Sequence, residues 1–489
     1  MLDPTRPGRA GPRTLPYTPG MVTGETGRDD QLVVGVDSST QSTKVVLVEV
    51  GSGRVVASGS APHPDGTEAD PEVWWDALQR AGRSMLERGQ AIGVGAQQHG
   101  MVVLDAGGAV AHPALLWNDL RSAPQAEQLV EEMGGAQRCA ELTGSVFTAS
   151  FTVTKLRWLA DLEPSAATRA AAVALPHDWL TQRLTGGELT TDAGDASGTG
   201  YLDPASRAWR PDIAEAAIGH PVQLPRIADP AEIVGRTASG AAVSAGTGDN
   251  MAAALGLQLA PGDVVVSIGT SGTAFALNDA PHADPTGLVA GFCDATGAYL
   301  PLACTINASR ILSTTARLLG CSLVEFDALA RSGPAGANGV VLLPYLDGER
   351  TPNRPSATGT FSGITSTTER ADIARAAVEG LLCSLADAIS ALRLPARRVI
   401  MIGGGSRSAV VQLLSPSFFE AEVVVPEPAE YVAIGAARQA AWALAGSAEP
   451  PRWETPPARQ FGVDDGDSRQ AAEVRERYAT LRERTAAWT

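Results

Sequence analysis

Two short segments place hydroxyl-rich turns between apolar runs, a pattern suited to binding phosphate. In residues 32–50 (LVVGVDSSTQSTKVVLVEV), two valine-rich runs are separated by Ser39, Thr40, Gln41 and Ser42. Residues 264–277 (VVVSIGTSGTAFAL) repeat the design with a turn of Gly269, Thr270 and Ser271. A turn of this kind between strands offers backbone N–H groups and hydroxyls to an anion. One such turn could be an ordinary polar hairpin, whereas two facing turns could clamp one nucleotide.

Two aspartates stand beside glycine or hydroxyl residues, where a carboxylate could take part in phosphoryl transfer. Asp37 ends the first apolar run, and a carboxylate there can hold Mg²⁺, which prefers oxygen ligands. In residues 245–258 (AGTGDNMAAALGLQ), Asp249 precedes an alanine-rich helical pattern and could accept a hydroxyl proton from the nucleophile. Asp37 could instead stabilise an Asx turn, and Asp249 could be a helix N-cap. The local sequence leaves both interpretations open.

Three other segments could bind a small polar ligand. Residues 95–105 (GAQQHGMVVLD) carry Gln98 and His99, which suit sugar hydroxyls, although a lone histidine is more often a core or surface residue. Residues 115–121 (LLWNDLR) form either a tryptophan-anchored loop or the edge of a polyol site. In residues 403–408 (GGGSRS), three glycines would let the backbone approach a flat ligand, but a strand-to-helix turn needs no ligand. None of these turns contains a P-loop or a Rossmann fingerprint.

The elements that would position these residues alternate between strand and helix patterns. Apolar residues recur at helical spacing or form short β-like runs in 72–90 (helix), Ala91–Val94 and Met101–Leu104 (strands), 306–319 and 371–393 (helices), 398–402 (strand), 430–445 and 468–486 (helices). This alternation predicts α/β layers. The repeated hairpin predicts two halves of like architecture.

The same patterns predict four segments along the chain. Residues 1–30 are rich in Pro, Gly and Arg and predict a disordered tail, with Met21 as an alternative start. Residues 31–245 form the first lobe and residues 246–447 the second. A Pro/Glu-rich stretch opens the last segment, 448–489, which ends in a charged helix.

Composition excludes several classes of protein. The 489 residues carry 38 basic and 54 acidic side chains, a net charge of −16, which argues against binding to nucleic acid or anionic membranes. Five cysteines without a C-x-x-C pair make a disulfide framework or a zinc site unlikely. No membrane-length apolar run or signal peptide is recognisable, so we expect a cytoplasmic protein.

An ordered set of motifs decides between the open interpretations. From 31 to 445 the sequence resembles the FGGY carbohydrate kinases, and within them the xylulokinases, through GVDSSTQSTK (35–44), DPEVWWDAL (70–78), AQQHGMVVLD (96–105), LLWNDLRSA (115–123), TKLRWL (154–159), HDWLTQRLTG (177–186), TDAGDASGTGYLD (191–203), GTGDN (246–250), SIGTSGT (267–273), LPYLDGERTPNR (343–354) and IGGGSRS (402–408). The resemblance implies an α/β fold of two actin-like (ribonuclease H-like) lobes with a cleft between them. It also implies ATP and Mg²⁺ held mainly by the second lobe, sugar held mainly by the first, and a possible homodimer.

The resemblance also assigns roles residue by residue. Asp249 matches the catalytic base, and Asp37 matches the carboxylate that supports Mg²⁺ and the transferring phosphoryl group; both are metal candidates. Gln98 and His99 match the sugar-binding pair, and the further candidates for the sugar pocket are Asn250, Trp117 and Asp119. The matched ATP-binding residues are Ser39, Thr40, Gln41, Ser42 and Lys44 in the first phosphate motif, Gly269, Thr270 and Ser271 in the second, and Gly403, Gly404, Gly405 and Ser406 in the adenosine motif.

The expected reaction is ATP-dependent phosphorylation of D-xylulose to D-xylulose 5-phosphate. Three departures from the family pattern bear on this: Gln98 stands where many xylulokinases have methionine, Ala96 replaces a glycine, and Thr247 stands where glycine is common. The absence of an Arg-Glu pair argues against glycerol as substrate. Another ketose or polyol (ribulose, ribitol, arabinitol, fuculose or gluconate), a non-catalytic sugar-binding protein and a chaperone-like ATPase are the alternatives.

Overall fold

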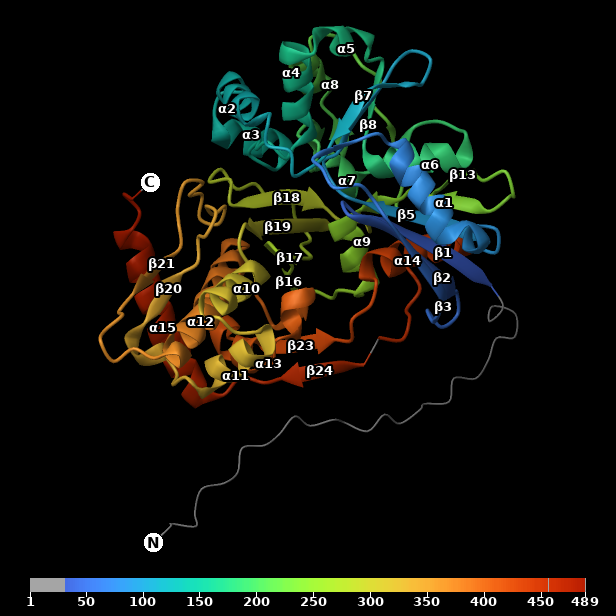
Figure 1. Cartoon of the computed structure of the whole chain (residues 1–489). Helices are drawn as coiled ribbons and strands as arrows, with labels where there is room; N and C mark the ends of the chain where they lie inside the picture. Colours follow the sequence, from blue (N-terminus) through green and yellow to red (C-terminus); the bar gives the residue numbers. More distant parts are fainter. Residues whose placement is uncertain (1–30, 456, 489) are drawn as a thin grey trace.

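Two seven-stranded mixed sheets with helices packed around them organise the computed structural model, which describes residues 31–455 and 457–488 (Figure 1). The expected tail, residues 1–30, and the alternative start at Met21 lie outside the described residues. In Figure 1 the first sheet lies in the blue and green half of the chain and the second in the yellow to red half.

The first sheet has the strand order β13-β14-β5-β1-β2-β3, and β15 pairs with β5 beside this path. β1 runs parallel to β5, and both β14 and β15 run parallel to β5, while β2, β3 and β13 are antiparallel to their neighbours. The strands are β1 (Leu32–Ser38), β2 (Ser42–Glu49), β3 (Val55–Pro62), β5 (Ala91–Ala96), β13 (Ile233–Arg236), β14 (Ala242–Ser244) and β15 (Thr247–Gly248).

The second sheet repeats this order, which agrees with the two halves of like architecture that the repeated hairpin predicts. Its order is β18-β19-β17-β16-β22-β23-β24, with β16, β22 and β23 parallel and the other pairs antiparallel. The path β3-β2-β1-β5-β14-β13 therefore corresponds to β19-β17-β16-β22-β23-β24. The strands are β16 (Asp263–Ile268), β17 (Gly272–Ala276), β18 (Val289–Cys293), β19 (Tyr299–Thr305), β22 (Arg398–Ile402), β23 (Glu422–Pro426) and β24 (Ala458–Phe461).

Smaller sheets complete the strand inventory of the described residues. A four-stranded sheet next to the first large sheet has the order β4-β7-β6-β8, and three two-stranded pairs lie elsewhere. Their bounds are β4 (Glu68–Ala69), β6 (Met101–Leu104), β7 (Val110–Leu115), β8 (Ala172–Ala174), β9 (Thr190–Asp192), β10 (Leu202–Asp203), β11 (Ala208–Trp209), β12 (Arg226–Ala228), β20 (Val341–Leu343) and β21 (Thr360–Ser362).

The helices confirm the patterns read from the sequence, with small shifts at their ends. The 72–90 pattern forms α1, which ends at Leu86 because the backbone turns at Glu87 and Arg88 before β5 begins. The helices are α1 (Glu72–Leu86), α2 (Ala123–Glu132), α3 (Ala136–Thr143), α4 (Thr152–Leu162), α5 (Pro164–Arg169), α6 (Pro176–Thr185), α7 (Ala193–Ala196), α8 (Pro211–Ile218), α9 (Asp249–Gly256), α10 (Ser309–Leu318), α11 (Leu323–Ser332), α12 (Arg370–Ala391), α13 (Ala409–Phe419), α14 (Tyr431–Ala445) and α15 (Asp465–Arg484).

The helix α14 packs on the first sheet although it comes from the end of the second half of the chain (Figure 1). Glycine makes this approach possible, because a Cβ at Gly35 would lie 1.8 Å from the carbonyl oxygen of Ala433. The same helix contacts α9 through Gly435 and Gly256, where an added Cβ would also overlap backbone atoms of the other helix. Backbones at this distance exclude larger side chains and fix the position of α9.

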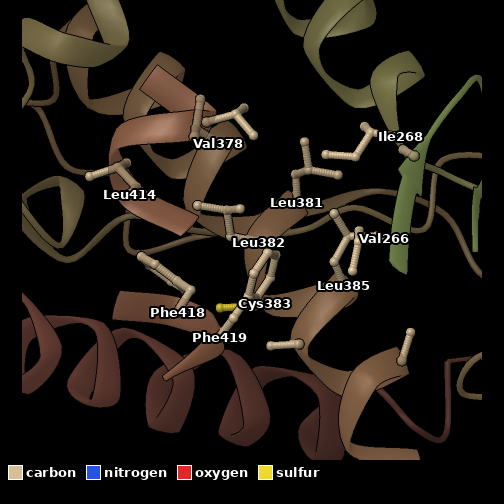
Figure 2. Packing of buried hydrophobic residues seen from close by; sticks show 14 of the residues in the cluster. Val266, Ile268, Val378, Leu381, Leu382, Cys383, Leu385, Leu414, Phe418 and Phe419 are labelled. Atoms are coloured by element: carbon tan, nitrogen blue, oxygen red, sulfur yellow. The ribbon is translucent and has the colours of Figure 1, made fainter. Parts of the chain in front are cut away.

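A large apolar core supports the second sheet. Figure 2 shows α12 residues Leu381, Leu382 and Leu385 packed between Val266 and Ile268 of β16 and the aromatic rings of Phe418 and Phe419. The C-terminal helix α15 adds Ala471, Val474, Tyr478 and Leu481 to this core. No helix among the described residues is long and apolar enough to cross a membrane.

The Pro/Glu-rich stretch before α15 contacts the first half of the molecule. The indole N–H of Trp453 donates to the carbonyl oxygen of Val50, and the ring fills the space beside Gly53. The backbone N–H of Trp453 donates to Gln258. The last segment of the chain therefore contacts both halves, through Trp453 and through α15.

Candidate active site

Three parallel strands of the first sheet end side by side, and the residues that follow them include all the main sugar-side candidates. The register pairs Ser38 at the end of β1 with Ala96 at the end of β5, and Ala96 with Gly248 at the end of β15. Carboxyl ends of parallel strands meet at one sheet edge, where open α/β sheets bind ligands. Asp37, the pair Gln98 and His99, and Asp249 are thus brought together from three separate segments.

Asp37 is a buried carboxylate with one lysine partner. The Oγ of Ser39 donates to Asp37, and the ammonium nitrogen of Lys44 lies 3.7 Å from Oδ2. Burial raises the pKa of Asp37 to about 6, against the lowering effects of Ser39 and Lys44. Lys44 also forms an ion pair of 2.7 Å with Glu430, which immediately precedes α14. Asp37 is therefore held in place while part of its charge remains uncompensated.

The turn after β1 is tied to two neighbouring loops. Thr40 accepts a hydrogen bond of 2.8 Å from the indole N–H of Trp117 and donates to Oε1 of Gln97. Trp117 is 37 % exposed, so one side of its ring faces solvent at this edge. Asp119, two residues on, is buried and accepts from Thr67 and Arg121, and these contacts lower its pKa against the effect of burial. Asp119 thus shapes the loop that carries Trp117.

Asp249 is the first residue of α9 and retains one unengaged carboxylate oxygen. Its Oδ1 accepts from the backbone N–H and the side-chain amide of Asn250, and no described residue donates to Oδ2. Burial, followed by the charges of Asp37 and Asp195, raises the pKa of Asp249 to about 8. In its ionised form, a carboxylate with a raised pKa and a free oxygen is a stronger base than an ordinary aspartate. Asp249 is not the helix N-cap that the local sequence also allowed, because the N-cap of α9 is Gly248.

Gln98 offers a buried donor next to Asp249. Its Oε1 accepts from Asn250 Nδ2 at 2.9 Å, while its Nε2 has no hydrogen-bond partner among the described residues. Leaving such a donor buried and unpaired costs about 1–3 kcal/mol. A ligand oxygen at this position would satisfy the amide.

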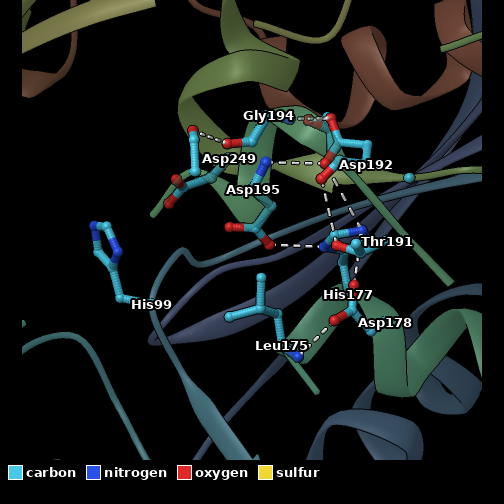
Figure 3. A network of polar contacts seen from close by, with 12 residues as sticks. His99, Leu175, His177, Asp178, Thr191, Asp192, Gly194, Asp195 and Asp249 are labelled. Atoms are coloured by element: carbon cyan, nitrogen blue, oxygen red, sulfur yellow. Dashed lines mark hydrogen bonds and ion pairs between the residues drawn. The ribbon is translucent and has the colours of Figure 1, made fainter. Parts of the chain in front are cut away.

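His99 offers an acceptor at the same edge (Figure 3). Its Nδ1 lies 2.6 Å from the carbonyl oxygen of Gly198, which can only accept, so Nδ1 carries the hydrogen. Burial lowers the pKa of His99 to about 3, so the ring stays neutral and Nε2 is an acceptor. Among the described residues nothing donates to Nε2. Gln98 and His99 therefore present one donor and one acceptor, which matches the two-way hydrogen bonding of a sugar hydroxyl.

A buried polar network holds the segment that leads into Asp249 (Figure 3). Thr247 donates to Oδ2 of Asp192 at 2.7 Å, and Asp192 also accepts from the backbone of Gly194 and Asp195. Nδ1 of His177 lies 2.7 Å from Asp195, and its ring packs against Gly246. The hydroxyl of Thr247, a departure from the family pattern, therefore anchors the loop before the base.

The ATP-side candidates from the second half of the chain lie at one edge of the second sheet, while those from Ser39 to Lys44 lie at the first sheet. β16 and β22 are parallel, and Ser267 is paired with Ile402, so the turn of Gly269, Thr270 and Ser271 lies beside Gly403 and Gly405. The carbonyls of Gly269 and Thr270 accept from Ser309 and Ala308 at the start of α10. A Cβ at Gly405 would lie 2.3 Å from the side chain of Ile268, so the two turns pack closely. Gly404 has open space above its Cα, and Ser406 closes its own turn on Gly403.

The site offers two carboxylates to a divalent ion that is already bound to nucleotide phosphates, and not a complete set of protein ligands. Among the described residues, no group of three or more His, Cys, Asp or Glu side chains is arranged to hold a metal ion. Asp37, in β1, and Asp249, directly after β15, lie at the same edge of the first sheet, and the charge of Asp37 contributes to raising the pKa of Asp249. Mg²⁺ bound to nucleotide phosphates usually needs only one or two protein carboxylates. The residues present fit that requirement.

Several residues of the site carried no functional assignment from the sequence. Asp192, Asp195 and His177 lie within motifs that were recognised, but their spacing does not show that they meet beneath Asp249. Glu430 gave no signal of its own. Lys155 lies in the recognised segment TKLRWL (154–159), which gave it no role of its own.

Comparison with known proteins identifies the class. Residues 32–257 match the N-terminal domain and residues 264–444 the C-terminal domain of the FGGY family of carbohydrate kinases. The chain belongs to this family, and the expected two-domain, actin-like α/β fold is confirmed.

Its relatives include several xylulose kinases. The sequence is 47 % identical to the xylulose kinase of Streptomyces coelicolor over 449 residues, and 48 % identical to that of Streptomyces rubiginosus over 453 residues. Each alignment covers 87 % of this chain and 91 % of the relative. The crystal structure of the xylulose kinase from Bifidobacterium adolescentis matches with a TM-score of 0.85 at 43 % identity, over 93 % of this chain and 99 % of that one.

Proposed function

We propose that this protein transfers the γ-phosphoryl group of ATP to the terminal hydroxyl of D-xylulose, giving D-xylulose 5-phosphate and ADP. The observation that carries the proposal is the meeting of Asp249 with Gln98 and His99 at one sheet edge, in a chain 47–48 % identical to xylulose kinases. A base, a donor and an acceptor within one site match the hydroxyl groups of a polyhydroxy substrate, each of which can donate and accept.

In the proposed reaction, the sugar is held by Nε2 of His99 as acceptor and Nε2 of Gln98 as donor. Oδ2 of Asp249 accepts the proton of the O5 hydroxyl as O5 attacks the γ-phosphorus. The bond between the γ-phosphorus and the bridging oxygen breaks, and ADP leaves with that oxygen. Asn250 donates to the other oxygen of Asp249, Oδ1, and so leaves Oδ2 free for the proton.

The phosphates of ATP are assigned to the two turns. Ser39, Thr40, Gln41 and Ser42 with Lys44 would contact them from the first sheet, and Gly269, Thr270 and Ser271 from the second. Gly403, Gly404, Gly405 and Ser406 would contact the adenosine, and the open space at Gly404 permits a flat ligand to approach the backbone there. Bound Mg²⁺ would neutralise charge on the β- and γ-phosphates, with Asp37 and Asp249 as its protein partners.

Trp117 and Asp119 are assigned to the rim of the sugar pocket, Trp117 by its ring and Asp119 through the loop it stabilises. A cytoplasmic location and a homodimer complete the proposal. Neither affects the chemistry of the site.

The test is ADP release with Mg·ATP across D-xylulose, D-ribulose, L-ribulose, D-arabinitol, glycerol and D-gluconate. The expected result is the highest kcat/KM for D-xylulose. A higher value for another sugar would keep the kinase mechanism and assign the difference to the pocket, where Gln98 is the departure from the family pattern. Sugar binding without ADP release on any of them would refute the kinase and favour a binding protein.

A further inference from the structure

Lysine is nearly absent from this chain, and both of its lysines lie at the proposed active site. Lys44 and Lys155 stand against 36 arginines, so arginine fills almost every basic position. Lys44 contacts Asp37, as described above. Lys155, in α4, takes no part in the proposed chemistry, yet it is one of the largest fully buried side chains of the molecule.

The surroundings of Lys155 are costly for an ammonium group. Its Nζ donates to two backbone carbonyls, those of His99 at 3.2 Å and of Ser150, and it forms no ion pair with any described residue. Burial lowers its pKa to about 7, and the charge of Asp119 only partly opposes this effect. Burying such a group without a carboxylate partner is unfavourable. Its position therefore needs a reason beyond the stability of the fold.

The contact with His99 supplies that reason. His99 has a φ of 67°, in the left-handed region that non-glycine residues rarely adopt. Its carbonyl oxygen accepts from Nζ of Lys155 and also from Oγ1 of Thr152 at 3.2 Å. The ring packs against Phe151 and Phe292, with centroids 5.0 and 5.6 Å away.

These contacts fix both ends of His99. The backbone is held by Lys155 and Thr152, and Nδ1 is held by Gly198. Rotation of the His99 carbonyl away from Lys155 would change ψ at His99 and φ at Gly100. Because Gly100 leads directly into β6, this rotation would turn the Cα–Cβ bond of His99 and carry the ring away from Gly198. Nε2 would then lose its place at the sheet edge.

We propose that Lys155 is a positioning residue for the sugar site: its ammonium group holds the carbonyl of His99 so that the imidazole presents Nε2 to the substrate. A lysine suits this role because it is a compact donor on a flexible stem, able to reach two converging carbonyls. The planar five-donor fork of arginine would leave most of its N–H groups without acceptors there. The proposal rests on the proposed function, since it takes His99 as a sugar ligand.

The test combines Lys155→Met, which removes the donor at similar length, with Thr152→Val, which removes the second donor without changing charge. In each variant, KM for D-xylulose should rise about tenfold, as expected for losing a hydrogen bond that orders a binding residue, while KM for ATP changes less than twofold. Thr143→Val is the matched control. Thr143 is equally buried and donates to the carbonyls of Cys139 and Ser145 and not to that of His99. The KM of Thr143→Val for the sugar should therefore equal that of the wild type.

A double-mutant cycle separates positioning from general destabilisation. On the His99→Ala background, Lys155→Met should cause no further rise in KM for the sugar, because its effect passes through His99. The proposal would be overturned if the rise in KM for the sugar in the double variant equalled the product of the two single rises. It would also be overturned if a folded Lys155→Met protein had an unchanged KM. If Lys155→Met does not fold, Thr152→Val carries the same cycle with the same two outcomes.

A readout independent of activity keeps this inference distinct from the proposed function. In ¹⁵N-histidine NMR spectra of the full chain, the signal that disappears in His99→Ala is assigned to His99. Its chemical shifts should report a neutral ring with hydrogen on Nδ1. In Lys155→Met this signal should shift or broaden. An unchanged signal in Lys155→Met overturns the positioning role. If Lys155→Met changes the His99 signal as expected but the wild-type protein phosphorylates none of the sugars, the proposed function is refuted and the positioning role is not.

Discussion

The contact between α9 and α14 makes the catalytic geometry depend on a residue far from the reacting atoms, Gly435. A Cβ built on Gly435 would lie 1.8 Å from the carbonyl oxygen of Ala252 and 2.8 Å from the backbone nitrogen of Gly256. Both atoms belong to the backbone of α9, the helix that begins at Asp249, so no side-chain rotation can relieve the overlap. To reach ordinary contact near 3.4 Å, Gly435→Ala must move the helices apart by roughly 1.5 Å.

The magnitude follows from two opposing effects. Alanine in place of glycine inside a helix stabilises it by about 1 kcal/mol, whereas forcing a methyl group into a closely packed contact costs about 3 kcal/mol. The net loss of about 2 kcal/mol should lower Tm by about 4–8 °C. If the helices separate by movement of α9, Asp249 moves with it, and a displacement of about 1 Å at a reacting group can lower kcat about 100-fold.

The assays are thermal unfolding followed by circular dichroism and kcat for ADP release at saturating sugar and ATP. Gly462→Ala is the control, because no heavy atom beyond its two chain neighbours lies within 4 Å of the added Cβ. The Tm and kcat of this variant should equal those of the wild type. A Gly435→Ala protein with wild-type Tm and kcat would refute the reasoning, since it would show that the contact between α9 and α14 tolerates a side chain.

Two further predictions concern the base. Asp249→Ala should lower kcat by about 100-fold or more while Tm stays within a few degrees of the wild type, and near-normal turnover would reject its role as base. Because Asp249 must be ionised to accept a proton and its pKa is raised to about 8, kcat/KM for the sugar should fall as pH decreases below about 8. Excess Mg²⁺ should shift this decline to lower pH, since a cation favours the ionised carboxylate. A decline beginning only near pH 4, the range of an ordinary aspartate, would contradict the effect of burial.

Local patterns predicted the elements with the clearest period or composition, whereas α2–α8, α11, α13 and most of the short strands had no prediction. The strand at 398–402 was predicted with the observed bounds, and the pattern at 430–445 forms α14 from Tyr431 to Ala445. Both succeed because period and composition are properties of a short window of sequence. The duplicated hairpin likewise predicted two halves of like architecture, and the two large sheets share one strand order along six strands.

The site divides differently between sequence and structure. Asp37, Gln98, His99 and Asp249 could be named because each lies in a short motif with its own chemistry and because the ordered set resembles one family. Their proximity could not be read from the motifs, since it depends on the parallel register of β1, β5 and β15.

The supports of the site were decided by tertiary structure alone. His177 and Thr247 are 70 residues apart in the sequence, yet His177 contacts Asp195 and Thr247 contacts Asp192 in one network. Lys155, in α4, likewise reaches the carbonyl of His99. The C-terminal contacts of Trp453 and α15 are of the same kind. The sequence by itself determined the elements, the family and the reactive side chains, because these are written in local spacing and residue type. Only the folded chain decided which buried groups hold those side chains in place, because such contacts join residues distant in sequence and depend on how the helices and sheets pack.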